Sequence, residues 1–485
     1  MEELIGGKYG VLTEGQVAKV HQAALEVLRR VGLRVESEEF LKIYGDGGAE
    51  VDFKNWIVKI PPKLVEDALK VVPHRVVLHG RKPEYKMDLG DAKVYLGTGG
   101  AAVQILDLET GEARATTLQD QARLARLAEN LENVHFFQCP VVPRDVPADK
   151  VTVNSFYAAL ANTYKNVQEA AHSLQAARDA IELAALIAGG DDKLRAAPFI
   201  SFVTSWMVSP LKIDTHIAAV LREVVQSGIP VALSSAPITG STGPITLAGL
   251  LTQVHAEELS GIVLSQLIRE GAPVLYGPVP GAANLRDMSF AGGAIETALM
   301  DVAAIQMARY INVPIYSDAG ETDSKLPDIQ AGYEKAASII LVALAGGNYI
   351  HHAAGMMEGM FTVAYEQYVI DNDIIGMALR VLQGIEVDED HLALEVMERV
   401  GPGGNYLIQD HTIKHLRSGE FFIPHVADRQ GREAWEAGER LDARERARQR
   451  AKEILAQPAR NLIPKEIDRE IRKRFEILLE RSDHM

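Results

Sequence analysis

The chain has 485 residues, of which 47% are hydrophobic and 24% charged, a balance typical of a globular protein with one large or two to three ordinary domains. The formal net charge of −16 argues against a nucleic-acid partner, and the single cysteine, Cys139, excludes an internal disulfide and a zinc site of several thiolates. Residues 1–10 lack the pattern of a signal peptide, and no uncharged apolar stretch reaches the roughly 20 residues of a membrane helix, so we expect a cytoplasmic protein without a membrane partner.

Residues 1–130 are expected to form an α+β extension rather than part of a repeating unit. Thr13 is a candidate N-cap for a helix whose apolar residues recur at spacings of three and four over residues 17–28. Short strand-like segments follow at residues 56–60 and 75–78. These elements alternate without a fixed period, which is why we assign them to an extension.

A glycine-rich run at residues 97–100 follows the apolar segment 93–96. Gly97, Gly99 and Ala102 fit the spacing of a dinucleotide-binding fingerprint, but that motif must open a helix. Residues 103–108 instead alternate between apolar and polar and end in a turn. The run therefore favours a hairpin or a tight backbone approach over a dinucleotide site.

From residue 131 onward, apolar strand candidates alternate with amphipathic helices at a spacing of about 30 to 40 residues, the length of one strand, one helix and their loops. The candidates are residues 136–142, 166–171, 199–205, 229–233, 273–276, 313–316 and 348–350. Seven units are visible and the eighth is not clear. The pattern favours an α/β fold with a (β/α)8 TIM-type barrel over residues 131–400, with a doubly wound open sheet as the competitor.

Residues 401–485 are expected to form a helical C-terminal extension. The stretch 431–457 is rich in Arg and Glu with sparse apolar residues, a pattern typical of a solvated or subunit-facing helix. We therefore expect a homo-oligomer. Acidic residues 388–390 precede a short helix, and their proximity to His391 is interpreted as a helix-dipole effect rather than a metal site.

The densest set of polar side chains lies in residues 312–360. A strand, a polar loop, a helix, a glycine turn, a second strand and a histidine pair follow in the order of a βαβ unit. Asp318 and Glu321 come after the first of these strands, and His351 and His352 after the second. Because ligands of parallel α/β folds bind beyond the carboxyl ends of the strands, we expect the chemistry here.

Each of these residues also has a simpler interpretation. In an extended strand, His351 and His352 point to opposite faces, so only one is expected to face the interior while the other packs. Asp318 and Glu321 are also candidates to cap the following helix. Trp206, after the third strand candidate, is either a packing residue at the rim or a ligand contact.

An aromatic cage is the contact that a quaternary ammonium would need. Cation–π attraction to such a group is worth roughly 1–2 kcal/mol once desolvated. Trp206 would form one wall, and Tyr95, Phe202 and Tyr276 would complete the cage. The acidic overall charge is compatible with a cationic substrate.

Four stretches resemble the trimethylamine methyltransferase family. They are Tyr-Leu-Gly-Thr-Gly-Gly at 95–100, Ser-Pro-Leu at 209–211, Asp-Ser-Lys-Leu-Pro-Asp-Ile-Gln-Ala-Gly-Tyr-Glu at 323–334 and Gly-Pro-Gly-Gly at 401–404. The third is the most specific, and the resemblance covers nearly the whole chain. It implies a (β/α)8 barrel that passes a methyl group from a methylated amine to the Co(I) form of a corrinoid held on a separate protein.

Archaeal trimethylamine enzymes of this family carry pyrrolysine near the sixth-strand loop. Residues 318–325 of this chain are all standard amino acids, so it is similar to the non-pyrrolysine branch, in which quaternary amines such as glycine betaine are substrates. A quaternary amine leaves as a neutral tertiary amine and needs no acid to activate it. Such a protein would belong to one-carbon metabolism.

The expected site follows from these patterns and the resemblance. The expected catalytic residues are Asp318, Glu321 and His351. The expected substrate-binding residues are Tyr95, Phe202, Trp206, Tyr276 and His352. No metal is expected, and the corrinoid (cobalamin) is expected to come with a corrinoid-binding partner protein rather than to be bound by this chain.

Other functions remain open at this point. The donor is glycine betaine, another betaine, or trimethylamine or another methylated amine. A barrel lyase that uses His351 and Glu169 as acid and base is an enzyme of a different class. A quaternary-amine binding protein without activity is the non-enzymatic alternative.

Overall fold

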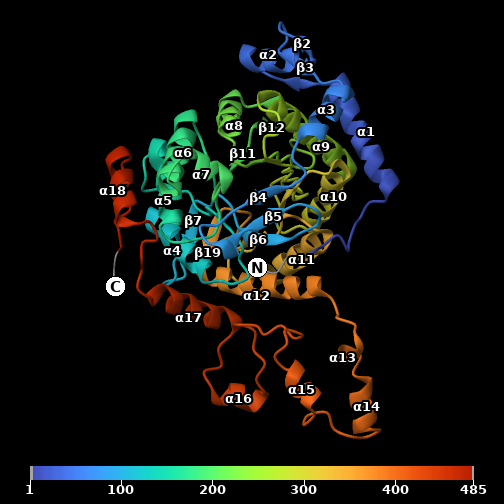
Figure 1. Ribbon diagram of the computed structural model, residues 1–485, viewed down its shortest axis with the longest axis vertical. Helices are drawn as coiled ribbons and strands as arrows, with labels where there is room; N and C mark the ends of the chain where they lie inside the picture. Colours follow the sequence, from blue (N-terminus) through green and yellow to red (C-terminus); the bar gives the residue numbers. More distant parts are fainter. Residues whose placement is uncertain (1–3, 483–485) are drawn as a thin grey trace.

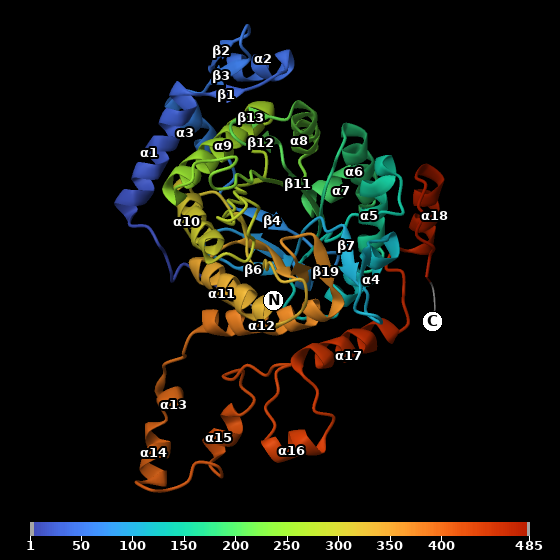
Figure 2. The same ribbon diagram turned by 180° about the vertical axis from the view of Figure 1, so that it is seen from behind.

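The computed structural model describes residues 4–482 and has a mixed α/β fold (Figures 1 and 2), which confirms that the chain is of the α/β class. Parallel pairing joins eight strands in chain order and returns from the last to the first. We call this set the strand ring. It consists of β6 (Tyr95–Thr98), β9 (Phe137–Gln138), β10 (Val167–Ala170), β11 (Ile200–Thr204), β14 (Val231–Leu233), β15 (Val274–Leu275), β16 (Tyr316–Asp318) and β17 (Tyr349–Ala354).

Two ladders and two single bridges make up the strand ring. The strands from β9 to β15 form one ladder, and β16, β17 and β6 form the other. Parallel bridges Gly97↔Phe136 and Tyr276↔Ile315 join the ladders at both ends. The strand missing from the seven candidates of the repeating pattern is therefore β6. The pattern does not include it because a hairpin as well as a helix separates β6 from β9.

Helices surround the strand ring in both views. They are α4 (Leu118–Glu129), α5 (Val151–Leu160) preceded by the 3-10 turn Ala148–Lys150, α6 (Leu174–Ala188), α7 (Asp191–Ala196), α8 (Thr215–Ser227), α9 (Leu247–Ile268), α10 (Ile295–Ile311), α11 (Ile329–Ala345) and α12 (Tyr365–Gln383). Each ring strand is covered by helices on one face and by side chains of the other strands on the opposite face. Both faces are therefore buried, which explains the near-continuous apolar sequences of these strands.

A four-stranded sheet combines the hairpin that follows β6 with two strands that follow β17. Its order is β18 (Met356–Met357), β19 (Thr362–Ala364), β7 (Gln104–Leu106) and β8 (Ala113–Ala115). The hairpin of β7 and β8 follows the glycine-rich run directly. No helix opens at the glycines, so the dinucleotide interpretation is wrong and the alternative of a hairpin with a tight backbone approach is confirmed.

The N-terminal segment contributes α1 (Glu14–Arg30), α2 (Glu38–Asp46), α3 (Pro62–Val71) and a sheet. Thr13 caps α1 as expected, because its side chain accepts a hydrogen bond from Gln16 N. The sheet order is β12 (Met207–Val208), β13 (Lys212–Ile213), β1 (Leu33–Arg34), β3 (Ile57–Lys59) and β2 (Glu50–Asp52). This sheet ties the N-terminal segment to the loop that follows β11.

One hairpin covers the amino-terminal end of the strand ring. It consists of β4 (Val76–Leu78) and β5 (Met87–Leu89), with the 3-10 turn Pro83–Tyr85 between them. Its apolar side chains share a buried cluster with residues at or near the starts of ring strands, among them Tyr95, Phe136, Tyr316 and Tyr349. This hairpin therefore closes the amino-terminal end of the ring with apolar contacts.

Beyond α12 the chain leaves the strand ring and projects away from it in both views. We call residues 385–440 the arm. It contains α13 (Glu389–Leu392), α14 (Leu394–Val400), α15 (Asp410–His415) and α16 (Arg432–Ala437). The chain then returns through α17 (Ala443–Ala456), which packs along α12, and α18 (Lys465–Arg474). None of the described helices has the length and apolar composition of a membrane span.

Candidate active site

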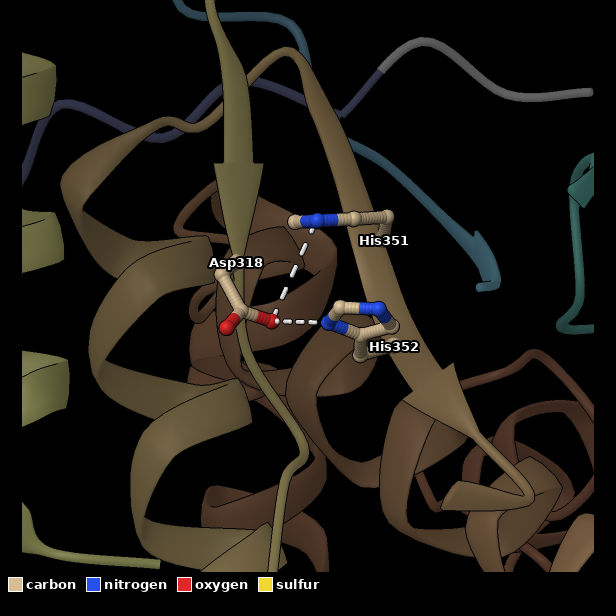
Figure 3. Close-up of side chains that lie close together, drawn as sticks. All are labelled: Asp318, His351 and His352. Atoms are coloured by element: carbon tan, nitrogen blue, oxygen red, sulfur yellow. Dashed lines mark hydrogen bonds and ion pairs between the residues drawn. The ribbon is translucent and has the colours of Figure 1, made fainter. Parts of the chain in front are cut away.

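The candidate site is built from the last residue of β16 and from two residues in the middle of β17. Asp318 ends β16 and lies opposite His351 in the parallel register, so the two side chains leave the strands on the same face. Asp318 Oδ1 is 2.9 Å from His352 Nδ1 and 3.8 Å from His351 Nδ1 (Figure 3). All three side chains are buried. The sequence-predicted juxtaposition of the acid with the histidine pair is therefore present.

Both histidine rings lie on the same side of β17, so the expectation that only one faces the interior is wrong. Their ring centroids are 4.0 Å apart and their planes 27° from parallel. The cause is a register shift between Ile350 and Ala354 together with a φ of 60° at His352. A bulge of this kind re-aims a side chain that an extended strand would send to the other face.

The left-handed backbone at His352 has consequences for its neighbours. A non-glycine residue in this region costs about 1–3 kcal/mol, so surrounding contacts must hold it, and such residues cluster at functional sites. Gly99 supplies one contact: a Cβ at that position would lie 2.6 Å from His352 N and 2.7 Å from His352 Cδ2. The glycine-rich run after β6 is thus required for the close approach to the histidine.

Glu321 completes the charged cluster. Its Oε1 lies 3.2 Å from His352 Nδ1, and its side chain is buried. The residue that caps α11 is Asp328, whose side chain accepts from Ala331 N at 3.0 Å. The alternative in which Asp318 and Glu321 cap the helix is therefore wrong.

The loop between β15 and α10 is held against Glu321. Asp323 accepts hydrogen bonds from Gly292 N at 3.1 Å and Gly293 N at 3.3 Å. Glu334 on α11 in turn accepts from Asp323 N at 3.0 Å and from the Thr322 hydroxyl at 2.5 Å. The stretch from Asp323 to Glu334, the most specific part of the sequence pattern, thus fixes the loop that carries Glu321.

The cluster holds charges of both signs. Burial lowers the pKa of His352, but attraction to Asp318 and hydrogen bonds to Asp318 and Glu321 outweigh it and raise the pKa to about 9. Burial favours neutral Asp318, yet the positive charge of His352 keeps its pKa below the usual value. Burial, followed by repulsion from Asp318, raises the pKa of Glu321 to about 7. Burial and the charge on His352 lower the pKa of His351 to about 3.

Several buried oxygens in the cluster lack partners. Among the described residues, Asp318 Oδ2 and Glu321 Oε2 make no hydrogen bond. Asp301 on α10 lies behind them with one free carboxylate oxygen, and burial raises its pKa well above the ordinary value. Buried acceptors normally have a partner, so these oxygens are suited to receive a ligand. One atom from each of Asp318, His351 and His352 also meets the spacing for a metal ion, and the absence of a metal stays a prediction.

Tyr316 is a site neighbour that the sequence analysis missed. Its ring centroid lies 4.0 Å from that of His351, and its hydroxyl donates to Gln138 Oε1 at 3.2 Å. Tyr316 precedes Asp318 by two residues on the same strand. Strand alternation places such residues on one face, and that signal was available in the sequence.

The four aromatic residues predicted to bind substrate lie elsewhere. Tyr95 starts β6, at the amino-terminal end of the ring, where its hydroxyl accepts from Asp88 N at 3.2 Å. Phe202 packs edge-on against Phe156 of α5, with ring centroids 5.5 Å apart. The remaining two, Trp206 and Tyr276, contact α9: Gly261 lies against the Trp206 ring, and the Tyr276 hydroxyl is 2.9 Å from His255 Nδ1.

Trp206 provides a test of the aromatic cage. Because its buried ring fills space against α9, we expect Trp206→Ala to lower the free energy of unfolding by about 3–5 kcal/mol while the KM for the substrate stays within about twofold. Denaturant unfolding and steady-state kinetics measure the two effects. An increased KM without lost stability would instead support the cage. The role of the four aromatics in binding stays a prediction until then.

Glu169, the second residue of the lyase alternative, faces Cys139. Burial raises its pKa to about 8, and its Oε1 accepts from Ala170 N at 3.1 Å. Among the described residues, no hydrogen bond or ion pair joins Glu169 to His351. The structure therefore gives the acid–base pair of a lyase no contact between its members.

Comparison with known proteins decides the family. The sequence pattern of the trimethylamine methyltransferase (MTTB) family matches residues 5–478. The chain belongs to the trimethylamine methyltransferase family. The match spans nearly all of the chain, and the protein is accordingly a methyltransferase.

Relatives within the trimethylamine methyltransferase family include proteins named for two substrates. The chain is 36% identical over 466 residues to the glycine betaine methyltransferase of Desulfitobacterium hafniense strain Y51, covering 96% of this chain and 95% of that protein. It is also 36% identical over 455 residues to a trimethylamine methyltransferase of D. hafniense strain DSM 10664 / DCB-2, covering 94% and 91%. The crystal structure of the Methanosarcina barkeri monomethylamine methyltransferase aligns with a TM-score of 0.47 at 15% identity, over 92% of this chain and 96% of that one.

Proposed function

We propose that this methyltransferase moves a methyl group from a quaternary amine, glycine betaine or a similar betaine, to the Co(I) corrinoid of a partner protein. The observation that carries the proposal is the buried cluster with both signs of charge. A betaine is a zwitterion with a trimethylammonium and a carboxylate. His352 is a cation suited to the carboxylate, and Asp318 and Glu321 are acids suited to the ammonium.

The charge pattern favours a betaine over trimethylamine. Trimethylamine presents at most one charge, which leaves the buried imidazolium of His352 without a partner on the substrate. Identity does not separate the two donors, because relatives named for each are equally similar to this chain. The glycine betaine relative and the zwitterion-matched cluster together support the betaine.

In this reaction the protein mainly positions the substrate. The corrinoid would supply the nucleophile for the methyl carbon, the C–N bond breaks, and the nitrogen keeps the electron pair as a neutral tertiary amine. The residues of this chain bind the ammonium, orient one methyl group and exclude water. Asp318 Oδ2 and Glu321 Oε2, the buried acceptors without partners, are the atoms suited to hold the methylated cation.

We further infer that the strand ring is a (β/α)8 barrel, with the segment before β6 and residues 401–485 as its extensions. Two observations support it: the parallel pairing follows chain order, and it returns to its first strand. A doubly wound sheet would reverse its strand order at a switch point. Because β6 takes part in the ring, we place the start of the barrel at β6 rather than at residue 131.

The direct test uses chemically reduced cob(I)alamin, alone and on a cognate corrinoid protein. Glycine betaine, other betaines and trimethylamine are supplied one at a time, and the loss of the Co(I) absorption band is followed. We expect methylcobalamin to form with betaines. If cobalamin is methylated only when trimethylamine is supplied, the donor is trimethylamine and not a betaine. Binding of a betaine without methylation would support the binding-protein alternative.

The activity is expected to depend on pH through Glu321. Its pKa is about 7, and a cationic donor binds the ionised form, so kcat/KM should rise with pH up to about 7 and fall about tenfold per unit below it. A second fall is expected above about 9, where His352 loses its proton. The measurement is a pH profile of kcat/KM between pH 5.5 and 9.5 in the Co(I) assay.

Glu321→Gln is the variant that checks this assignment. It should abolish the acidic limb and lower kcat/KM at pH 8, because the amide is neutral at every pH. Glu296→Gln, at an exposed position of α10, is the control and should keep the wild-type profile. An acidic limb that persists in Glu321→Gln would assign the ionisation to another group.

We propose that the arm mediates a homo-oligomer. Its exposed apolar residues, with relative exposures from 48% to 83%, are Ile385, Val387, Leu392, Leu394, Met397, Tyr406, Leu407, Ile408, Ile413, Leu416, Phe421 and Ile423. Monomers rarely expose apolar patches above a few hundred Å². A stable interface buries about 800 Å² on each partner, an area within reach of this many large side chains.

Light scattering tests the oligomer. We expect the wild-type chain to be at least a dimer at 10 µM, and the double variant Leu407→Asp/Ile408→Asp to be a monomer, because charges would then lie in the interface. Leu285→Asp, at an 82% exposed position outside the arm, is the matched control and should leave the mass unchanged. A monomeric wild-type chain would contradict the proposal.

A further inference from the structure

The arm contains a second cluster of metal-ligand side chains, separate from the strand ring. Asp390 and His391 lie on α13, and His411 and His415 lie on α15. One ligand atom from each of Asp390, His411 and His415 lies within 4.8 Å of the other two. His415 Nε2 is 2.8 Å from Asp390 Oδ2, and the rings of His391 and His415 are 4.9 Å apart.

Local structure explains why these side chains converge. His411 and His415 are four residues apart on one helix, so they project from the same face, as pairs of zinc ligands on a helix do. The N-cap Asp388 accepts a hydrogen bond from His391 N at 2.7 Å and starts α13 two residues before Asp390. The cluster therefore joins two short helices that are separated by residues 393–409.

The arm needs a stabilising element that its apolar residues do not supply. Within residues 385–440, the buried hydrophobic side chains are Val396 and Val426, while large apolar residues are exposed. Segments of this size rarely fold on a hydrophobic core alone and use disulfides, metals or oligomerisation. Cys139 is the only cysteine of the chain, so a disulfide within the arm is excluded.

The histidines of the cluster are partly shielded, whereas the side chain of Asp390 is 45% exposed. The side chains of His415 and His391 are 14% and 20% exposed. Asp390, His391 and His415 line a cavity of about 730 Å³ between the arm, the end of α12 and residues 4–8. An ion can therefore enter from this cavity.

The groups around the cluster hold its histidines in place. His391 Nδ1 is 2.7 Å from Asp388 Oδ1, and Glu386 lies 3.5 Å from its other nitrogen. Both nitrogens of His391 thus face carboxylates, and its ring packs beside that of His415 without being a ligand itself. Lys414 Nζ donates a hydrogen bond to Asp390 Oδ2 at 2.7 Å. A bound metal ion would displace this ammonium group, so that one cation replaces another beside the carboxylate.

We propose that Asp390, His411 and His415 bind a divalent transition metal of the zinc class and thereby hold α13 and α15 together. Two imidazoles and one carboxylate form a donor set that zinc accepts, with water in the fourth position of a tetrahedron. The site is independent of the methyl-transfer site, and its role is to fix the two helices of the arm to each other.

Metal titration of the full chain tests the proposal. After removal of bound metal with a chelator, Co²⁺ is added and the visible absorption of tetrahedral cobalt is followed, with Zn²⁺ as competitor. We expect one equivalent to bind, and His411→Ala/His415→Ala to weaken binding at least 100-fold. His216→Ala, an exposed histidine outside every cluster, should bind like the wild type.

A second variant and a second readout keep the outcomes distinct. His351→Ala should retain metal binding; loss of binding there would place the ion at the strand ring and overturn the proposal. No binding by the wild-type chain would also overturn it. Trypsin digestion of the wild-type chain needs no variant: Zn²⁺ should slow cleavage after Lys414 and Arg417 at least fivefold, and an unchanged rate contradicts the proposal.

Discussion

Replacing Asp318 with Asn is expected to lower kcat/KM for the methyl donor by about 10²–10³-fold, the range found when one preorganised electrostatic partner is removed. Asp318 holds His352 at 2.9 Å and supplies the charge that keeps its imidazole protonated. The amide has nearly the same shape but no charge. The Co(I) assay with glycine betaine gives kcat/KM for both proteins.

The pKa of His352 provides a readout that a merely structural defect would not produce. Attraction to Asp318 raises that pKa to about 9, so it should fall in Asp318→Asn, and the alkaline limb of the pH profile should move to lower pH. Asp287→Asn, in an exposed loop, is the control for the substitution itself. Wild-type kcat/KM in Asp318→Asn would remove the cluster from the mechanism.

Lys335→Met is expected to lower the free energy of unfolding by about 3–5 kcal/mol, because removing one partner of a buried ion pair leaves an uncompensated charge. Lys335 on α11 and Asp371 on α12 are 3.3 Å apart and both 0% exposed. Lys335 Nζ also donates to Gly320 O and to Met356 O, the latter at 3.1 Å. These carbonyls flank the candidate site, so kcat/KM should fall as well.

Urea unfolding monitored by circular dichroism measures the stability change. Lys63→Met is the control, because Lys63 lies on the surface of α3 and its loss should leave the midpoint unchanged. The double variant Lys335→Met/Asp371→Asn should recover part of the stability without recovering activity. If Lys335→Met unfolds at the wild-type midpoint, the ion pair of Lys335 with Asp371 does not stabilise the packing of α11 against α12.

Gly320 shows how closely these loops approach the strand. Its φ is 89°, and a Cβ there would lie 2.7 Å from Ala353 Cα on β17. The backbone after Asp318 can lie against β17 only because the position is a glycine. The contact brings the loop that carries Glu321 to the histidine pair.

The sequence alone determined the fold class, the family and the position of the acid and the histidines. The α/β class follows from strands and helices alternating at a fixed spacing. Asp318 and His351 belong to two successive strands of one βαβ unit, and parallel pairing places them side by side. These are local patterns, readable within about 40 residues of chain.

Only the tertiary structure decided the eighth strand, the second histidine and the placement of the aromatics. β6 joins the ring through partners at β17 and at Phe136, and pairing over such separations leaves no periodic signal. His352 faces Asp318 because a bulge interrupts strand alternation. Phe202 and Trp206 contact helices, which the sequence did not reveal. A strand that is buried on both faces has apolar side chains on both faces. Its sequence therefore does not indicate which residues face the helices and which face the interior of the ring.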